Sequence, residues 1–287
     1  MKQKLPVVVI IILILILAGL LIYAGYFFVK KRGVPEPPSQ SSKLSEEERV
    51  ARREALLETI QEITKGESAG TEFSVGIYDL KRDEYFGYND EKAQHAASVS
   101  KVLTAVYIYD LAEKGKVNLG EPMGLYNIET QIQFLINQSS PDSWDLLDTR
   151  FKPEDQTTFA KKIGLTASNI RLGKNLMSVK DVTLLFKKLA QGELLSESSR
   201  TKLFSYMQNT ETEVYFSPSF KRADVKFYHK TGQIGGEAHD AAIVEYKPNP
   251  FVLVVFSNNN VSPNITGRGK IMELTAQTVL EYFSQIN

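Results

Sequence analysis

Residues 96–101 read Ala-Ala-Ser-Val-Ser-Lys and open an apolar run, Val102 to Ala112, that predicts a buried helix beginning near a serine. Ser98 and Lys101 are three residues apart, so on a helix their side chains share one face about 5 to 6 Å apart. A serine hydroxyl needs an adjacent base to attack near neutral pH, and a buried lysine can be that base because desolvation disfavours its charged form. The helix N-terminus also orients N–H groups toward a developing oxyanion. These residues alone leave Ser98 as either a nucleophile or a helix cap.

The same Ser-x-x-Lys spacing occurs a second time, at Ser199 and Lys202. Ser199 lies in a polar run ahead of Leu203 and Phe204, where helix capping is a sufficient explanation. Ser98 differs because small residues precede it and a continuous apolar helix follows, which fixes its hydroxyl on a rigid element. We therefore assign the chemistry to Ser98 and a structural role to Ser199.

The composition is that of a globular chain with a sizeable core, because 43% of its 287 residues are apolar. Lysine and arginine number 34, as do aspartate and glutamate, and this balance argues against nucleic acid as a partner. Five of the basic residues lie in the first 32 positions, which hold no acidic residue, so the remainder is mildly acidic. The chain has no cysteine, which excludes disulfides and thiolate chemistry.

Three segments are predicted along the chain. Leu5 to Val29 is apolar throughout and long enough to cross a bilayer, so residues 1–32 are expected to form an N-terminal transmembrane anchor. A cleaved signal peptide is the alternative, but no small-x-small cleavage site follows the run. Residues 33–44 are rich in proline and serine and read as a spacer. Residues 45–287 form the predicted catalytic domain.

Along the domain, the spacing of apolar residues first indicates a helix and two strands, then a series of helices, and finally strands followed by a closing helix. Ser45 and Glu48 form a capping box that starts a first helix. The remaining expected elements are strands at Phe73–Leu80 and Tyr85–Tyr88, helices within Ile128–Phe151 with a break at residues 137–141, helices at Val179–Leu189 and Ser198–Met207, strands at Val225–Lys230, Ala241–Tyr246 and Phe251–Ser257, and a closing helix from about Lys270 to Ile286.

A Lys-Thr-Gly tripeptide, Lys230-Thr231-Gly232, is expected at the end of the first late strand, followed by Gln233. A cation, a hydroxyl and a residue without a side chain can hold a carboxylate and admit close approach of a substrate. Considered alone, the tripeptide is equally a turn. Its order after Ser-x-x-Lys, with a serine-bearing break between them, matches a known set of catalytic motifs.

With these motifs in this order, the chain resembles class A beta-lactamases and the related penicillin-recognising D,D-peptidases, from about Ser45 to the C-terminus. The resemblance implies an α+β, beta-lactamase-like fold, in which an antiparallel sheet is flanked by the two terminal helices and carries an inserted all-helical lobe. It implies that Ser98 is the acylated nucleophile, Lys101 its proton acceptor, and Ser139 the relay to the departing nitrogen. The substrate-binding residues that it implies are Lys230, Thr231, Gly232 and Gln233, the last sharing the oxyanion hole with the N–H of Ser98.

Two departures from the family pattern affect the expected activity. The second motif reads Ser139-Ser140-Pro141, so its usual aspartate and asparagine are absent, and Ser139 is either the relay or a loop serine. No acidic residue occurs from Gln156 to Lys180, so the omega-loop glutamate that activates the deacylating water is missing, within a loop that is absent or severely shortened. We expect weak deacylation, with Lys101 or a carboxylate from elsewhere, such as Glu237, as a partial substitute.

The other chemically suggestive residues are expected to be structural. His95, His229 and His239 show no metal-ligand spacing, so no metal and no cofactor is expected. Trp144, the only tryptophan, is interpreted as a core residue of the helix after the break.

The sequence thus predicts a membrane-anchored acyl-serine hydrolase that acts on beta-lactams, on D-Ala-D-Ala peptides of peptidoglycan, or on both. Its catalytic domain is expected outside the cytoplasmic membrane, where these compounds are met. The alternative is a catalytically silent peptidoglycan-binding or beta-lactam-sensing module that kept the pocket. The physiological substrate and the oligomeric state stay open at this point.

Overall fold

The computed structural model describes residues 44–65, 70–171, 174–259 and 266–286. Contacts within the chain group residues 44–287 into one compact unit. The predicted anchor and all but the last residue of the predicted spacer lie outside the described residues. Among the helices that the structure describes, none combines the length and the apolar character needed to span a membrane. The division into anchor, spacer and catalytic domain therefore stays a prediction.

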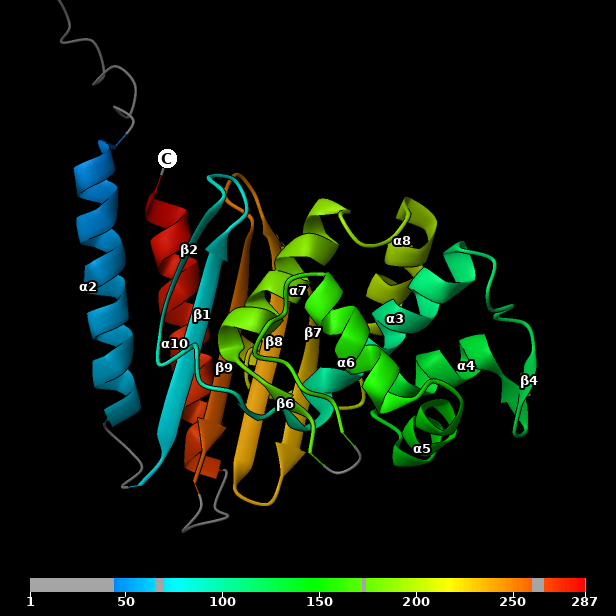
Figure 1. Cartoon of the computed structure of the whole chain (residues 1–287). Coiled ribbons are helices and arrows are strands. Elements are labelled where there is room, and N and C mark those ends of the chain that lie inside the picture. Colours follow the sequence, from blue (N-terminus) through cyan, green and yellow to red (C-terminus); the bar gives the residue numbers. More distant parts are fainter. Residues whose placement is uncertain (1–43, 66–69, 172–173, 260–265, 287) are drawn as a thin grey trace, which may run out of the picture. The chain divides into compact units, whose positions relative to one another are not determined.

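An antiparallel sheet forms the centre of this unit (Figure 1), and within the described ranges it has five strands in the order β2, β1, β9, β8 and β7. The hairpin from the start of the domain joins the three late strands through the pairing of β1 with β9. The beginning and the end of the domain therefore build one sheet. The strands are β1 (Glu72–Asp79), β2 (Glu84–Tyr88), β7 (Val225–Ile234), β8 (Glu237–Tyr246) and β9 (Phe251–Asn258).

Strand β9 separates two apolar cores, because successive side chains of a strand point to opposite faces of the sheet. Val252, Val254 and Phe256 belong to the core shared with the helical part of the domain. Phe251, Leu253 and Val255 belong to the core beneath the terminal helices. All these side chains are fully buried, so the sheet is covered on both faces.

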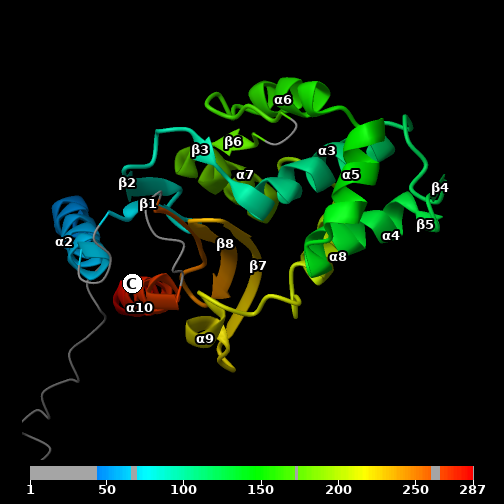
Figure 2. The same cartoon turned by 90° about the horizontal axis from the view of Figure 1, so that it is seen from below.

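The terminal helices α2 (Glu46–Lys65) and α10 (Thr266–Gln285) cover one face of the sheet (Figure 2). The predicted capping box of α2 is present: the Ser45 amide donates to Glu48 Oε2 at 2.8 Å, and the Glu48 amide donates to Ser45 Oγ at 3.2 Å. On α10, Phe283 stacks on Phe251 of the sheet with 4.3 Å between ring centroids. This layer is the pair of flanking helices predicted from the sequence.

A helical lobe is inserted between β2 and β7, and its helix α7 lies against the second face of the sheet (Figure 2). At its centre is α3, in which Val102, Leu103 and Ala105 are fully buried. The helices are α3 (Lys101–Glu113), α4 (Ile128–Gln133), α5 (Pro141–Arg150), α6 (Pro153–Lys162), α7 (Val179–Gln191) and α8 (Glu197–Tyr206). The predicted α+β class, a sheet with helices of this arrangement, is confirmed.

Short elements complete the lobe and its junction with the sheet. They are β3 (Gln94–His95), which pairs with β6 (Leu176–Met177), β4 (Pro122–Met123), which pairs with β5 (Tyr126–Asn127), α9 (Ser217–Phe220), a 3₁₀ turn (Ala97–Ser100) and a π-helical turn (Phe134–Gln138). The last two matter most here, because they carry or precede the two predicted active-site serines.

Three local expectations are corrected. Strand β7 does not end at Lys230, because β8 pairs with it as far as Ile234. Helix α6 does not stand out in the sequence because it is mostly polar, yet it buries Gln156 and Phe159. The cap of α8 is Ser196, whose Oγ accepts from the Ser199 amide at 3.4 Å, so Ser199 lies in the first turn rather than at the cap.

Candidate active site

Ser98 lies on the 3₁₀ turn Ala97–Ser100, directly before α3, and not in the first turn of an α-helix as expected. The turn begins with Ala97 at φ 44°, a left-handed conformation that alanine rarely adopts. The Ser100 hydroxyl holds it by donating to the Ala97 carbonyl at 2.8 Å. Ala97 and Val99 are buried while Ser98 is half-buried. The turn therefore presents the Ser98 hydroxyl outward on a rigid support.

Lys101, the first residue of α3, is 2% exposed and reaches toward the segment after α4. Its Nζ donates to the Ser139 carbonyl at 2.6 Å, contacts Ser139 Oγ at 3.4 Å, and lies 4.6 Å from the ring centroid of Trp144. Burial lowers the pKa of Lys101 to about 8, against the opposing effect of the Asp145 and Asp148 carboxylates. A lysine in this state is easily deprotonated, as a general base requires.

Ser139 lies between two lysines. It follows the π-helical turn in a left-handed conformation, with φ 56°, and its Oγ accepts from Lys230 Nζ at 3.1 Å, with Lys101 Nζ at 3.4 Å. A hydroxyl in contact with both ammonium groups can pass a proton from one to a substrate atom. These contacts are compatible with the predicted relay, and the role of Ser139 stays a prediction.

The unusual residues after Ser139 have a structural explanation. Ser140 is the N-cap of α5 and accepts from the Ser143 amide at 3.2 Å, while Pro141 occupies the first helical position, where its missing N–H costs nothing. Ser140 and Pro141, which follow Ser139 in place of the family's usual aspartate and asparagine, therefore begin helix α5.

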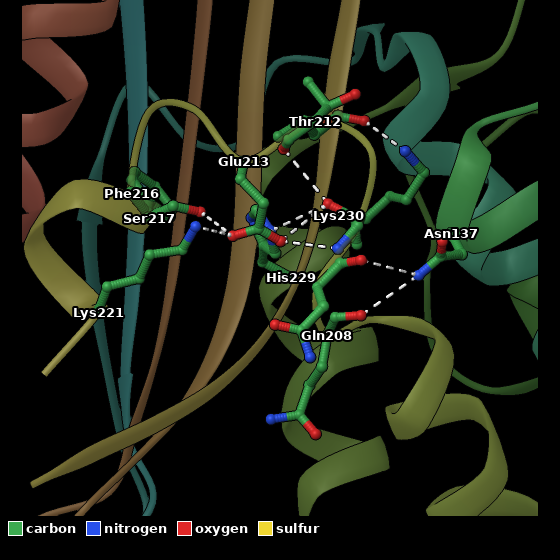
Figure 3. Close-up of polar contacts among 12 residues, drawn as sticks. Asn137, Gln208, Thr212, Glu213, Phe216, Ser217, Lys221, His229 and Lys230 are labelled. Atoms are coloured by element: carbon green, nitrogen blue, oxygen red, sulfur yellow. Dashed lines mark hydrogen bonds and ion pairs between the residues drawn. The ribbon is translucent and has the colours of Figure 1, made fainter. Parts of the chain in front are cut away.

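Asn137, one residue before the end of the π-helical turn, fastens this segment to the loop after α8 (Figure 3). Its Nδ2 donates to the carbonyls of Tyr206 and Gln208, both at 3.2 Å, and its own carbonyl accepts from the Glu211 amide at 3.1 Å. These contacts hold the irregular backbone that gives Ser139 its position. Sequence reasoning noted Asn137 only as a neighbour of Ser139, because the contact partners lie some seventy residues away.

Lys230 and Thr231 lie inside β7 and are 2% and 5% exposed. Lys230 Nζ donates to the Thr231 carbonyl at 2.9 Å and to Ser139 Oγ. Burial, followed by the nearby charge of Lys101, lowers the pKa of Lys230 to about 7. A bound carboxylate would favour the charged form and raise this pKa again. With a carboxylate bound, Lys230 can therefore carry a positive charge while Lys101 is a neutral amine.

Gly232 lies where β7 passes close to the Ser98 turn. A Cβ added to Gly232 would lie 3.1 Å from the Ala96 carbonyl oxygen and from Val99 Cγ2, so these neighbours would have to move by a few tenths of an ångström. The contact brings Gln233, the predicted oxyanion donor, to the same cavity as Ser98.

That cavity has a volume of about 240 Å³ and joins the predicted nucleophile to residues that the sequence did not reveal. Its lining residues are His95, Ala97, Ser98, Trp144, Asp145, Asp148, Asn175, Gln233 and Ile234. Trp144 is half-buried and packs against the core of the helical lobe, as predicted in part, and its ring also lies beside Lys101 Nζ. A hollow of about 310 Å³ near α9 and α10 is larger, but it contains none of the motif residues.

The two acidic residues of the cavity, Asp145 and Asp148, were missed by the sequence analysis. Both lie on α5, and the Lys101 ammonium group interacts electrostatically with both. Their spacing of three residues on the helix that follows Ser139 was the available signal, because it puts both on one helix face. The segment in which the loop glutamate was expected, Gln156 to Lys180, carries no acidic residue, although its Asn175 lines the cavity.

The histidines have distinct environments. His229 is fully buried, with Nδ1 3.1 Å from Asp240 Oδ1 and Nε2 3.3 Å from Glu213 Oε1 (Figure 3). Burial favours its neutral form, but the two carboxylates outweigh this and raise the pKa of His229 to about 9. His229 thus anchors the loop of Glu213 to β7 beside Lys230 as a structural cation. His239 is also fully buried, and burial lowers its pKa to about 4.

His95 and Glu237 are hydrogen-bonded to each other at the edge of the site. His95 Nδ1 lies 2.5 Å from Glu237 Oε2, and only His95 of the two lines the cavity. Glu237 was considered as a substitute carboxylate, but its partner is His95, whereas the carboxylates that line the cavity are those of α5.

The fold is that of the serine hydrolases of the beta-lactamase type. The chain belongs to the beta-lactamase enzyme family, whose profile matches residues 55–133 and 142–283. The unmatched residues between the two segments are those of the π-helical turn, Ser139 and the start of α5. A comparison with curated protein sequences found no match.

Solved structures show the same fold. PBP-A superposes with a TM-score of 0.73 at 20% sequence identity, over 80% of this chain and 96% of PBP-A. A beta-lactamase from Xanthomonas campestris gives a TM-score of 0.72 at 18% identity, over 80% of this chain and 98% of that enzyme. A mutant of the class A beta-lactamase of the last common ancestor of Gram-negative bacteria gives a TM-score of 0.72 at 19% sequence identity, over 81% of this chain and 100% of that enzyme. The prediction of a class A beta-lactamase-like chain is confirmed.

Proposed function

We propose that the chain is an acyl-serine hydrolase that acts on beta-lactams, on D-Ala-D-Ala peptides, or on both, and that releases its acyl group slowly. The observation that carries this proposal is the position of the Ser139 hydroxyl between Lys101 and Lys230, beside the cavity that Ser98 lines. A related structure supports the choice of substrate, since a mutant of PBP-A was captured as an acyl-enzyme complex with penicillin G.

The geometry supports the following course of acylation. Ser98 Oγ attacks the carbonyl carbon while neutral Lys101 takes its proton, and the N–H groups of Ser98 and Gln233 stabilise the oxyanion. The C–N bond then breaks, and the departing nitrogen receives a proton through Ser139, which contacts both lysines. Lys230 holds the substrate carboxylate. The product is an ester on Ser98.

Slow release is proposed because the segment that supplies the deacylating glutamate in class A enzymes carries no acidic residue here. When the full-length chain is mixed with excess penicillin, intact-mass spectrometry should show a penicilloyl adduct that persists while free penicillin disappears slowly. General-base assistance contributes about 10² to 10⁴ in rate, so a base less effective than the loop glutamate leaves release slower than in an efficient beta-lactamase. Rapid loss of penicillin without an accumulating adduct would contradict slow release.

A catalytically silent binding or sensing module is the second candidate. One observation favours it: in the described part of the chain the Lys101 ammonium group donates to the Ser139 carbonyl, with no hydrogen bond to the Ser98 hydroxyl. The same mass measurement separates the candidates. A chain that binds penicillin reversibly but forms no adduct is a silent module.

We also propose that residues 1–32 span the cytoplasmic membrane once and that the catalytic domain lies outside, where beta-lactams and cell-wall peptides are met. The support is the length and apolar composition of Leu5–Val29, at least the roughly 20 residues that a bilayer requires. Protease added to intact spheroplasts should digest the domain. Full protection of the domain, with digestion only after lysis, would place it in the cytoplasm.

A further inference from the structure

The carboxylate of Asp148 is held in a fixed position at the cavity that Ser98 lines. Its Oδ1 accepts from Gln156 Nε2 at 2.8 Å. Gln156 is fully buried and fixed in turn, because the same Nε2 donates to the Phe151 carbonyl at 2.8 Å and its Oε1 accepts from Thr104 at 2.7 Å. The other oxygen, Oδ2, has no hydrogen-bond or ion-pair partner among the described residues, so it is free to accept a proton.

Asn175 is a second polar side chain that lines the same cavity. It is 5% exposed, and its carbonyl accepts from the Ala96 amide at 2.8 Å, which ties it to the Ser98 turn. Its Oδ1 is buried and, within the described ranges, has no hydrogen-bond donor. A buried acceptor without a donor is unfavourable, and a hydrogen bond from a bound molecule would remove that cost. Asp148 and Asn175 line the same cavity, so each can accept a hydrogen bond from water that enters it.

The charges around Asp148 come from three neighbouring elements and from its own helix. Asp145 of α5 and Glu154 of α6 disfavour its ionised form, Lys101 of α3 favours it, and His95 of β3 lines the same cavity. Burial, the largest effect, and these acidic neighbours raise the pKa of Asp148 to about 6, against the hydrogen bond from Gln156. The carboxylate is thus ionised at neutral pH and more basic than an exposed aspartate.

We propose that Asp148 is the general base that activates water for release of the acyl group from Ser98. This inference rests on the proposed function, because it requires an acyl-enzyme. The water oxygen attacks the ester carbonyl carbon and gives a proton to Asp148; the ester C–O bond then breaks, and Ser98 Oγ takes that proton back. Atoms and charge balance with water as the co-reactant. Asp148 accounts for the turnover that remains without a loop glutamate.

Asp145 is the rival within the same cavity. It is exposed, and among the described residues no hydrogen bond fixes its carboxylate, so it lacks the orientation that Gln156 gives Asp148. Asp142 is a matched control, because it is an exposed carboxylate on the same helix but does not line the cavity. Replacing each by asparagine keeps the size and shape of the side chain.

The test compares full-length wild type with Asp148→Asn, Asp145→Asn and Asp142→Asn. Each is acylated with penicillin G and freed of excess drug, and loss of the penicilloyl mass is followed with time. We expect all to be acylated to the same extent, with release slowed about 100-fold or more in Asp148→Asn only. Wild-type release at the same rate in Asp148→Asn, or slow release in Asp145→Asn alone, would overturn the assignment.

Two further measurements separate a base from a structural residue. Wild-type release should fall as the pH is lowered through about 6, because protonated Asp148 cannot accept a proton, and this fall should be absent in Asp148→Asn. Added formate should restore release in Asp148→Ala in a saturable way. A fall that persists in Asp148→Asn, or an absence of rescue in an acylated Asp148→Ala, contradicts the proposal. Failure of wild type itself to form an adduct would instead defeat the proposed function on which it rests.

Discussion

Replacement of Ser98 by alanine is expected to abolish covalent labelling of the chain by a fluorescent penicillin. The acyl group can form only on a hydroxyl that is exposed to the cavity and lies close to a lysine of lowered pKa. Ser98 meets both conditions, because it lines the cavity and is three residues before Lys101. Loss of the hydroxyl removes the atom that carries the ester, so no residual labelling is expected.

The second Ser-x-x-Lys pair provides the control for this experiment. Ser199 lies in the first turn of α8, and the side chain of Lys202 is 52% exposed, with Nζ 3.7 Å from Glu129 Oε1. Lys202 thus lies at the surface beside a carboxylate, whereas Lys101 is buried, so Ser199 lacks the environment of the Ser98 site. Ser199→Ala should label like wild type. Labelling that survives Ser98→Ala, with an unchanged circular dichroism spectrum, would move the nucleophile elsewhere.

The second large effect is expected for Lys101. Replacing it by methionine removes the proton acceptor of acylation and should slow that step by about 10² to 10⁴-fold. In wild type the acylation rate should rise with pH up to about 8 and then level off, because protonated Lys101 cannot accept the Ser98 proton and burial places its pKa there. Stopped-flow acylation on both sides of that pH measures both effects.

Lys202→Met is the matched control, since it removes the lysine of the other Ser-x-x-Lys pair. It should leave the acylation rate and its pH profile unchanged. A rise with pH that persists in Lys101→Met would assign the proton transfer to Lys230, the other buried lysine in contact with Ser139. A normal rate in Lys101→Met would contradict the general-base role altogether.

Much of the fold follows from local patterns in the sequence. The Ser45–Glu48 capping box, the buried helix after Ser98 and the late strands occur where their periodicity predicts them, because each depends on residues within a few positions of one another. Boundaries that depend on a partner strand were misplaced, as in β7, which continues past Lys230 because β8 pairs with it. Helix α6 was missed because its stability comes from burying a few residues against neighbours, not from a long apolar stripe.

By itself the sequence determined the family and the order of the motifs and indicated Ser98 as the candidate nucleophile, because these are properties of spacing along the chain. Only the tertiary structure decided which groups share the cavity. It placed Ser139 between two lysines, lowered the pKa of Lys101 by burying it, and brought Asp148 and Asn175 to the Ser98 turn. The physical reason is that burial and charge act between groups that are near in space, and the distances that govern them are created by packing among segments that are far apart in sequence.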